Sequence, residues 1–541
     1  LPEPEIISEN EYAAPRDDIE DQLVKIWSTI LLADSTSIGI DDNFFMLGGH
    51  SLKATVILSK VHKIFNIKVT LNEFFKMPYI RLLAEYIKSS QTEEYRAVEP
   101  VEKKEYWPLS SAQKRLFILQ QLEPENTNYN IYAVLKLGGK LDKSRMGESL
   151  RKLIRRHESL RTSFERIAEQ PVQRILHPKA IGFKIEYQET ENIQEAIDRF
   201  IRPFDLSQYP LLRVGLIKGE EEGCILMVDM HHIISDGTSV ELFKREFMEI
   251  YAGKELPPLN IQYKDYSEWQ NSDMEKERIG RQEYYWMKQF AGGVPVLELV
   301  YDFPRPSLKN YEGSTLCFEF NREETAALQR MALDSSVTLY TLLLALFYIF
   351  LGKISGQEDI VVGTTTAGRL HGDLAPLIGM FVNTLGLRNY PRKDKIFSEF
   401  LQEVYDRTLE AFENQDYPFE DLVEKLDLYR DVSRSPLFDV MFSLQNMEIT
   451  EISIPGLKLT PYEYENQTAK FDLLLMAFEV SGRLEFTLEY CTKLFKKSTI
   501  ERFIGYFKDL TTAVLEDVDI KLLNINVTSH LVVPKSGAAQ E

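Results

Sequence analysis

The stretch that most constrains the fold is a change of pattern near the middle of the chain. Residues 224–228 are an apolar run typical of a buried strand, and apolar residues then recur at helical spacing over residues 240–250. Thr238 and Glu241 have the spacing of a capping box, which predicts a helix that begins near Thr238. The polar string HHIISDG, residues 231–237, therefore lies on a strand-to-helix connection, where side chains can converge on a cleft.

Length and composition exclude several classes of protein. A chain of 541 residues is too long for one core, so two to four domains are expected. The net charge is −20, from 83 acidic and 63 basic residues, and no basic stripe offsets it, which argues against binding to nucleic acid or to an anionic membrane. Residues 339–351 are apolar but too short to span a bilayer, and the first residues do not resemble a signal peptide. Cys224, Cys317 and Cys491 are scattered, and Cys224 and Cys491 lie in strand-like runs that fit buried thiols in a reducing cytoplasm.

The first ninety residues predict a linker and a small helical bundle. Residues 1–15 are rich in Pro and Glu and are interpreted as a linker. Residues 16–90 contain four short amphipathic or apolar segments, around residues 19–30, 51–64, 72–76 and 80–87. Four short helices in about 75 residues predict an all-α four-helix bundle.

Ser51 begins the second of these helices, and a serine at a helix start is by itself a good cap. The string that contains it, LGGHSL at residues 47–52, follows an Asp-rich loop and resembles the attachment site of peptidyl carrier proteins. This resemblance implies that Ser51 accepts 4′-phosphopantetheine from a separate phosphopantetheinyl transferase. A helix N-terminus suits the phosphodiester, because the positive end of the helix dipole lies there. Gly48 and Gly49 are expected to let the transferase approach the backbone, and His50 points to an L-configured donor.

The remaining chain predicts an α/β protein behind a charged linker. Residues 91–106 carry eight charges in sixteen positions and are expected to form an extended, mobile connection. From residue 107 strand and helix patterns alternate, which indicates two subdomains, 107–280 and 281–525, followed by a tail at 526–541. The expected helices are 142–157, 238–251, 323–332, 338–353 and 397–414, and the expected strands are 130–137, 224–230, 359–363, 470–479 and 484–490.

Several further motifs occur in a fixed order around the histidines. They are SSAQKRL at 110–116, RHESLRTSF at 156–164, YKDYSEW at 263–269, IGMFVNT at 378–384 with Arg388, NQDYPFE at 414–420 and RDVSRSPLFDVMF at 430–442. Together with HHIISDG this set resembles the condensation domains of nonribosomal peptide synthetases, which belong to the chloramphenicol-acetyltransferase-like acyltransferases. Ser435 stands where the family often has Asn, a polar exchange that we expect to be tolerated.

The resemblance implies both an architecture and a reaction. It implies two chloramphenicol-acetyltransferase-like subdomains set in a V, with a tunnel that admits one loaded phosphopantetheine arm from each face. The α-amine of a downstream aminoacyl thioester attacks the upstream peptidyl thioester, without ATP. The partners would be the adjacent adenylation domain, a downstream carrier domain and the transferase, and the chain would be a cytoplasmic monomer.

His232 is expected to stand midway along this tunnel. An aminoacyl amine has a pKa of roughly 7.7–8, so it needs little activation, and we expect His232 to position the amine and accept its proton late. His231 is expected to be a scaffold residue, because a His-His pair alone more often contributes to packing than to chemistry. Gly237 offers either a backbone N–H to the thioester or room for it, and the sequence leaves both open.

Asp236 is expected to hold the loop through an arginine rather than to touch the substrate. By family analogy the candidates are Arg388 and Arg369, with Arg388 favoured. A metal site at His231, His232 and Asp236 is not expected, since the acyltransferases use none and no supporting donors are visible.

Three alternatives share parts of this pattern. An epimerisation domain has the same fold and histidine motif, but residues 381–384 and 439–442 and His50 favour condensation. A non-catalytic recruiting domain typically loses the histidine motif, which is intact here. A stand-alone acyltransferase with a small soluble acceptor has no use for a fused carrier, whose tethered arm supplies a high effective concentration.

Overall fold

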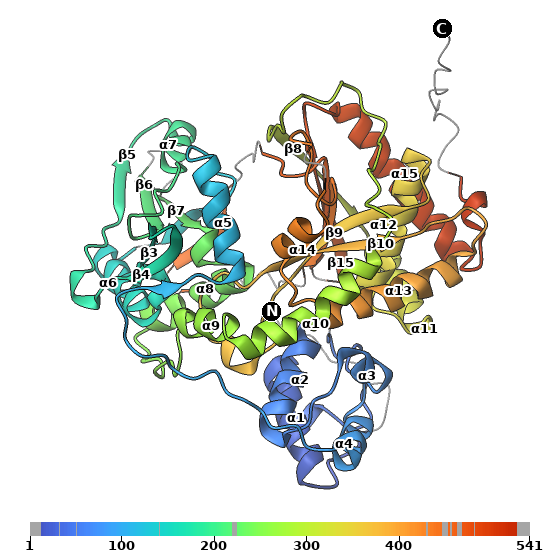
Figure 1. The fold of residues 1–541 in the computed structure, drawn as a ribbon, viewed down its shortest axis with the longest axis horizontal. Coiled ribbons are helices and arrows are strands. Elements are labelled where there is room, and N and C mark those ends of the chain that lie inside the picture. Colours follow the sequence, from blue (N-terminus) through green and yellow to red (C-terminus); the bar gives the residue numbers. More distant parts are fainter. Residues whose placement is uncertain are drawn as a thin grey trace.

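The computed structural model describes residues 12–31, 33–49, 51–139, 141–218, 224–428, 431–445, 453–454, 457–462, 468–480 and 482–526, without the side chains of Ser51, Leu52, Ser453 and Ile454. The described chain forms a small helical domain below two α/β lobes that diverge from a shared base (Figure 1). The expected architecture, a four-helix carrier followed by two lobes in a V, is confirmed.

The helical domain is built as its apolar spacing predicts. Its helices are α1 (Asp18–Leu31), α2 (Ser51–Phe65), α3 (Leu71–Lys76) and α4 (Ile80–Ser89), with the short turn η1 (Ser35–Ser37) after α1. Trp27, Phe44 and Phe74 meet edge to face at its centre and are fully buried. This aromatic cluster gives the domain a core of its own, separate from those of the lobes.

The helical domain rests on the second lobe rather than hanging free. Leu409 of α13 (Phe397–Glu413) is buried in the helical domain's own apolar cluster. Lys63 Nζ lies 2.7 Å from Asp373 Oδ1, beside the short turn η5 (Gly372–Leu374). The contact therefore combines apolar packing with an ion pair.

The linker, residues 91–106, is extended as expected, but it is also held along its length. The backbone N–H of Val98 donates to Asp373 Oδ2 at 3.2 Å, and that of Val101 donates to Asp265 Oδ1 at 2.9 Å. The Val98 side chain is buried against an apolar cluster that includes Tyr263 and Phe381. A mobile connection was expected from the charge content, but the buried Val98 and the two backbone hydrogen bonds hold the linker against the protein.

The first lobe carries a six-stranded sheet in the order β12-β13-β2-β7-β6-β5. Its strands are β2 (Asn130–Gly139), β5 (Glu186–Glu189), β6 (Leu212–Lys218), β7 (Cys224–His231), β12 (Ser453–Ile454) and β13 (Leu457–Pro461). A small sheet of β1 (Trp107–Pro108), β4 (Gln170–Ile175) and β3 (Thr162–Ile167) lies beside it. The helices are α5 (Ser111–Leu122), α6 (Lys143–Arg156), α7 (Ile193–Phe200), α8 (Gly237–Tyr251) and α9 (Tyr263–Gln270).

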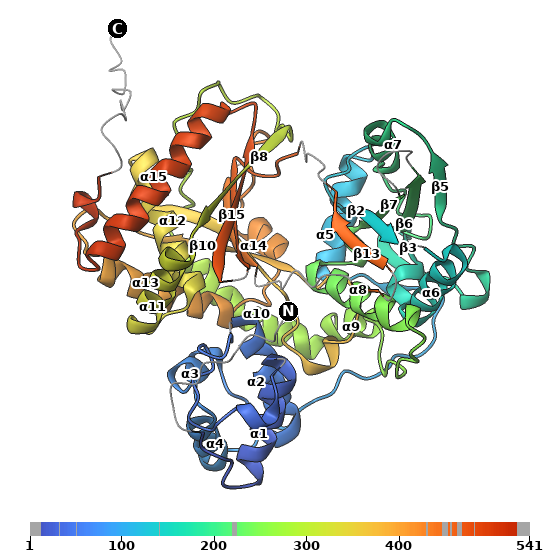
Figure 2. The ribbon, with the colours of Figure 1, turned by 180° about the vertical axis from the view of Figure 1, so that it is seen from behind.

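The second lobe, which contains β8, β10 and β15 in Figure 2, repeats the plan with its own sheet. The strand order of this sheet is β10-β9-β11-β14-β15-β8. Its strands are β8 (Gly313–Phe320), β9 (Ile360–Thr366), β10 (Asn383–Asn389), β11 (Val440–Gln445), β14 (Leu473–Val480) and β15 (Arg483–Cys491). Its helices are α10 (Asp273–Gln289), α11 (Arg322–Asp334), α12 (Leu339–Ser355), α13, α14 (Phe419–Lys425) and α15 (Lys497–Glu516). The apolar α12 is almost wholly buried, as a helix without a polar face must be.

Two segments of the second half of the chain cross into the first lobe. β13 pairs with β2, so residues 457–461 extend the first lobe's sheet. Ile378 and Met380 are buried in the first lobe's core. The chain therefore crosses the expected division at residue 280: Ile279 of α10 already packs in the second lobe's core, and residues 453–461 return to the first lobe.

Two smaller findings complete the fold. In the part of the chain that the structure describes, no single helix is long and apolar enough to cross a membrane; α11 and α12 pass that test only as a pair bent by 103°. Of the two cysteines expected to be buried, Cys491 is buried and Cys224 is half-buried, while Cys317 is exposed; all three are free thiols.

Candidate active site

The histidine motif lies where β7 ends and α8 begins, as the sequence predicts. β7 pairs with both β2 and β6, and the register places His231 opposite Asn130. A single turn, η4 (His232–Ile234), then carries the chain to Asp236. The motif thus sits on the end of a strand held on both sides, which fixes its backbone.

His231 is a scaffold residue in the structure. Its ring is fully buried, with Nδ1 accepting from the Ile233 N–H at 3.1 Å and Nε2 lying 3.2 Å from Gln120 Oε1. Because Nδ1 accepts, the proton of the neutral ring is on Nε2 and is donated to Gln120. Burial lowers the pKa of His231 to about 3, with the neighbouring His232 as the next cause.

His232 differs from His231 in that one ring nitrogen, Nε2, makes no hydrogen bond to any group that the structure describes. The ring is partly exposed, and Nδ1 lies 2.9 Å from the carbonyl oxygen of Ser235. A carbonyl only accepts, so Nδ1 carries the proton and Nε2 keeps its lone pair. The backbone N–H of His232 donates to the Tyr129 carbonyl at 2.7 Å. His232 is therefore a fixed, neutral ring that presents a proton acceptor.

The pKa of His232 is lowered to about 4. Burial is the main cause and the charge of Lys470 is the next, while the carboxylate of Asp236 opposes them. At neutral pH the ring is unprotonated and ready to accept. A depression this large also makes it a weak base, which bears on its role below.

Asp236 is buried, and its carboxylate links the two lobes. One oxygen accepts from Arg369 Nη2 at 3.1 Å and from the Ser239 N–H at 2.7 Å, and the other accepts from the Phe381 N–H at 3.0 Å. Ser239 Oγ also accepts from Arg369 and from the Gly379 N–H. The carboxylate is thus paired and hydrogen-bonded on every side, and none of these partners is a substrate.

The prediction that Arg388 pairs with Asp236 is wrong. Arg388 pairs with Asp359, at 2.9 Å and 2.7 Å, on the second lobe. It lies on β10, and its strand neighbour Val361 on β9 fixes it beside that carboxylate. Arg369 instead precedes the segment that enters the first lobe's core at Ile378 and Met380, and it therefore reaches Asp236.

The start of α8 also departs from the expectation. Asp236, not Thr238, is the N-cap, since its side chain accepts from the Ser239 N–H. A capping aspartate satisfies an otherwise free amide at the helix start and favours the dipole. Gly237, the first helical residue, is exposed, and a Cβ built there would meet nothing within 4 Å. Both suggested roles for Gly237, an open N–H and open room, remain available.

Two glutamines on α5 are functional supports that the sequence did not single out as such. Gln120 binds the ring of His231, and Gln113 Nε2 donates to the Ile233 carbonyl at 3.3 Å. They lie seven residues apart, hence on one face of the helix. Two buried glutamines at that spacing, the first within the SSAQKRL motif, are the signal that could have found them.

The carrier site is compatible with a phosphodiester. α2 begins at Ser51, and its first turn contains no acidic residue. Gly49 has a specific packing role, because a Cβ there would lie 2.4 Å from the Phe44 carbonyl oxygen. Gly48, by contrast, has φ +78° and open space around it, so it fits the expectation that a partner approaches there. His50 lies outside the described residues.

The remaining motif residues serve the scaffold. Asn383 donates to the carbonyls of Gln415 and Tyr417, within the second lobe. Tyr263 donates to the Met380 carbonyl and contacts Ser110, joining the first lobe to the crossing segment. These contacts agree with the view that such residues pack rather than react.

The molecule has two α/β lobes, an imidazole at a strand-to-helix turn and a helical domain that precedes the lobes in sequence. This is the architecture of an acyltransferase that is fed by a carrier domain. Comparison with known proteins specifies the family. The model of the condensation domain matches residues 103–531, and that of the phosphopantetheine attachment site matches residues 21–87. The chain therefore belongs to the condensation-domain family of nonribosomal peptide synthetases and contains a phosphopantetheine carrier domain.

Curated relatives agree over nearly the whole chain. It is 47% identical to bacitracin synthase 3 of Bacillus licheniformis over 522 residues, covering 96% of this chain and 8% of that protein. It is 45% identical to gramicidin S synthase 2 of Brevibacillus brevis, covering 98% of this chain and 12% of that one. The chain thus spans only about a tenth of the length of these relatives.

Among solved structures, the fold resembles the X-domain in its complex with OxyB from teicoplanin biosynthesis. The TM-score is 0.73 at 24% identity, covering 81% of this chain and all of that one. This likeness concerns the fold alone.

Proposed function

We propose that the chain forms peptide bonds between two thioester-bound groups, with His232 as the residue that handles the amine. One observation carries this proposal: within the described residues Nε2 of His232 makes no hydrogen bond, whereas His231, Asp236 and Nδ1 of His232 are all hydrogen-bonded. An open acceptor on a rigid turn can orient an amine N–H toward a carbonyl.

The pKa of His232 decides between two versions of this role. Moving a proton fully from an ammonium of pKa about 8 to an imidazole of pKa about 4 costs roughly 5 kcal/mol. Early general-base catalysis is therefore unfavourable, and the neutral amine needs none. His232 accepts a hydrogen bond from the amine, and accepts its proton only when attack has made the nitrogen acidic.

The step balances without another reactant. The amine lone pair forms the C–N bond, and the carbonyl π pair moves to oxygen. When that pair returns, the C–S bond breaks, and the proton held at His232 Nε2 passes to the departing sulfur. The imidazole ends as it began, neutral with Nδ1 bonded to the Ser235 carbonyl.

The carrier domain supplies the donor. We propose that Ser51 bears the 4′-phosphopantetheine, which when bound supplies a thiol that holds the acyl group as a reactive thioester. Helix α2 offers its N-terminal amides and a first turn free of acidic residues to the phosphodiester. His50 supports an L-configured donor, and a phosphopantetheinyl transferase installs the arm.

The partners follow from the reaction. We expect an adenylation domain to load the carrier and a downstream carrier domain to deliver the acceptor, because this chain has one attachment site. Free thiols at all three cysteines fit a cytoplasmic location, and the expected state is a monomer.

Recruitment of another protein is the second candidate function. It is favoured by the shared fold with the X-domain that was solved in complex with OxyB. Against it stands the intact motif with its open imidazole. Epimerisation remains a third reading that an assay of the loaded carrier alone separates.

The test is amide formation by the full chain, with the donor loaded on Ser51 and a soluble aminoacyl thioester as acceptor. Replacing His232 with Ala should lower the rate on the order of 10²–10³-fold while Ser51 loading, measured by intact mass, is unchanged. The exposed His177 gives the matched control, H177A, which should react like the wild type. Equal rates for H232A and wild type would remove the proposal, and D-product from the loaded carrier alone would favour epimerisation.

A further inference from the structure

The wall of the active centre opposite the histidines carries a lysine that no motif includes. Lys470 lies where the chain returns from β13 in the first lobe to β14 in the second. Its Nζ stands 5.3 Å from the centre of the Tyr129 ring, and the carbonyl of Tyr129 holds the His232 N–H. One residue of the first lobe therefore contacts both Lys470 and His232.

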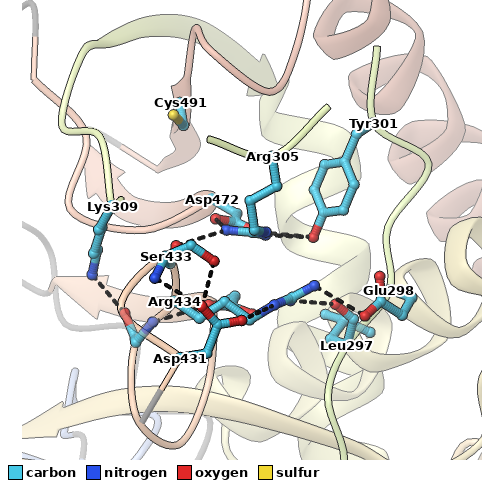
Figure 3. Close-up of polar contacts among 12 residues, drawn as sticks. Leu297, Glu298, Tyr301, Arg305, Lys309, Asp431, Ser433, Arg434, Asp472 and Cys491 are labelled. Atoms are coloured by element: carbon cyan, nitrogen blue, oxygen red, sulfur yellow. Dashed lines mark hydrogen bonds and ion pairs between the residues drawn. The ribbon is translucent and has the colours of Figure 1, made fainter. Parts of the chain in front are cut away.

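The backbone around Lys470 is fixed at every step. The Ala469 N–H donates to the Tyr311 carbonyl at 2.8 Å, and the Lys470 N–H donates to Glu489 Oε1 at 3.2 Å. Asp472, two residues on, is gripped by Arg305 and by Tyr301, whose hydroxyl lies 3.0 Å from it (Figure 3). The side chain of Lys470 thus projects from a rigid support, as a preorganised group must.

The ammonium group of Lys470 has no assigned partner within the described residues. No ion pair or hydrogen bond joins Nζ to another described group, although the side chain is half-buried. The neighbouring cations are committed: Lys309 Nζ donates to Ser435 Oγ at 2.6 Å (Figure 3), and Arg115 lies 3.1 Å from Glu420. A cation that is sheltered from water and makes no direct ion pair is costly, so its retention needs a reason.

The surface is hollowed close to this region. A hollow of about 440 Å³ is lined by residues 123–128 of the first lobe and by Tyr311 of the second. Tyr129 follows this lining directly, and Tyr311 binds the residue before Lys470. The hollow therefore adjoins the residues that carry both Lys470 and the backbone contact of His232.

We propose that Lys470 is the electrostatic partner of His232: a cation fixed on the second lobe that stabilises the oxyanion formed when the amine adds to the acyl carbonyl. This inference rests on the proposed function. His232 orients the nitrogen from one wall, and Lys470 stabilises the charge on oxygen from the other. Electrostatic stabilisation from a preorganised site is commonly the largest contribution to such a step.

The charges around the two residues support this arrangement. His232 is faced by Lys470, Asp236 and His231, and the positive charge of Lys470 helps to keep its imidazole unprotonated. Lys470 itself is faced by Glu489, Arg115 and Lys309; burial lowers its pKa first, and Glu489 raises it. The carboxylate of Glu489 thus favours the ammonium form.

The experiment compares K470M, which keeps the length of the side chain, with K470R, which keeps the charge. K458M is the matched control, because Lys458 is an exposed lysine on β13, just before the same crossing. With saturating soluble donor and acceptor thioesters, K470M should lower kcat roughly 10²-fold. KM should stay within about twofold, K470R should recover most of the rate, and K458M should match the wild type.

Two readouts do not depend on turnover. The melting temperature of K470M should equal or exceed that of the wild type, because a cation sheltered from water has been removed; a structural lysine would lower it. The imidazole pKa of His232, followed by NMR in histidine-labelled protein, should rise in K470M and not in K458M.

The outcomes separate the two proposals. If the wild type forms no amide, the proposed function falls, while the NMR shift still tests the link between Lys470 and His232. If the wild type reacts and H232A does not, an unchanged kcat in K470M overturns the role of Lys470 alone. A rate loss that K470R does not recover, with a lowered melting temperature, would assign Lys470 to packing.

Discussion

The two walls of the active centre are built in opposite ways. On the first lobe, His231, Asp236 and the backbone of His232 use nearly all their hydrogen-bonding capacity within the protein, leaving one lone pair open. On the second lobe, Lys470 is held by its backbone, and its ammonium group lies over the Tyr129 ring but makes no hydrogen bond or ion pair within the described residues. The first wall is specified for geometry and the second for charge, and a nucleophilic attack on a carbonyl needs both.

The comparison also shows that the histidine wall depends on the other lobe. Arg369, from the second half of the chain, completes the bonding of Asp236. The lobes are therefore joined by the same carboxylate that caps α8. Substitutions in the histidine wall test how strongly it is supported.

The largest effect is expected for Arg369→Ala. Asp236 is fully buried, and removing Arg369 leaves its charge uncompensated, which typically costs about 3–5 kcal/mol of unfolding free energy. The matched variant is R388A, whose ion pair with Asp359 is partly exposed and should cost about 1 kcal/mol or less. Urea midpoints of both variants measure the difference. Equal losses of unfolding free energy in the two variants would mean that the pairing of Asp236 with Arg369 does not hold the lobes together.

The second effect is a loss of stability at low pH. His232 has a pKa of 6.5 when unfolded and of about 4 when folded, so the unfolded chain binds one more proton between these values. Stability is fully present above pH 6.5 and is lost as pH falls from 6.5 toward 4, by about 1.4 kcal/mol per pH unit at most for this residue. H232Q should reduce the slope of unfolding free energy against pH by that amount in this window. H177A, at an exposed site, should leave it unchanged, and an unaltered slope in H232Q would contradict a depressed pKa.

The first wall could be predicted from sequence because its signals are local. The strand, the turn and the helix around His231 and His232 follow one another within thirty residues, and their pattern and motif agree. Thr238 was mistaken for the cap because sequence spacing cannot show that Asp236 turns toward its own helix. Arg388 was preferred to Arg369 because both are arginines near a motif, and only the tertiary path of residues 369–381 decides between them.

The second wall carried no such signal. Lys470 lies in an ordinary strand pattern, and its position depends on β13 crossing to pair with β2, more than 300 residues away in sequence. Contacts of that separation leave no periodicity. An unpaired lysine becomes visible only when its surroundings are known.

The smallest effect compares two glycines of the first wall's support. A Cβ at Gly379 would lie 1.8 Å from the ring of Tyr263, which is pinned by Ser110 and Met380. G379A should therefore lower the urea midpoint by an amount typical of overpacking, about 1–3 kcal/mol. At Gly237 a Cβ meets nothing, so G237A should leave stability within about 0.5 kcal/mol.

The activity of G237A then separates the two roles left open for Gly237. Alanine keeps the backbone N–H but fills the adjacent space, so a fall in the rate of amide formation assigns Gly237 to making room for the thioester. An unchanged rate assigns it to the N–H. Either result sharpens the contrast between the walls: in the first case the histidine wall is shaped around its substrate, and in the second it also contributes a dipole toward the oxygen that Lys470 faces.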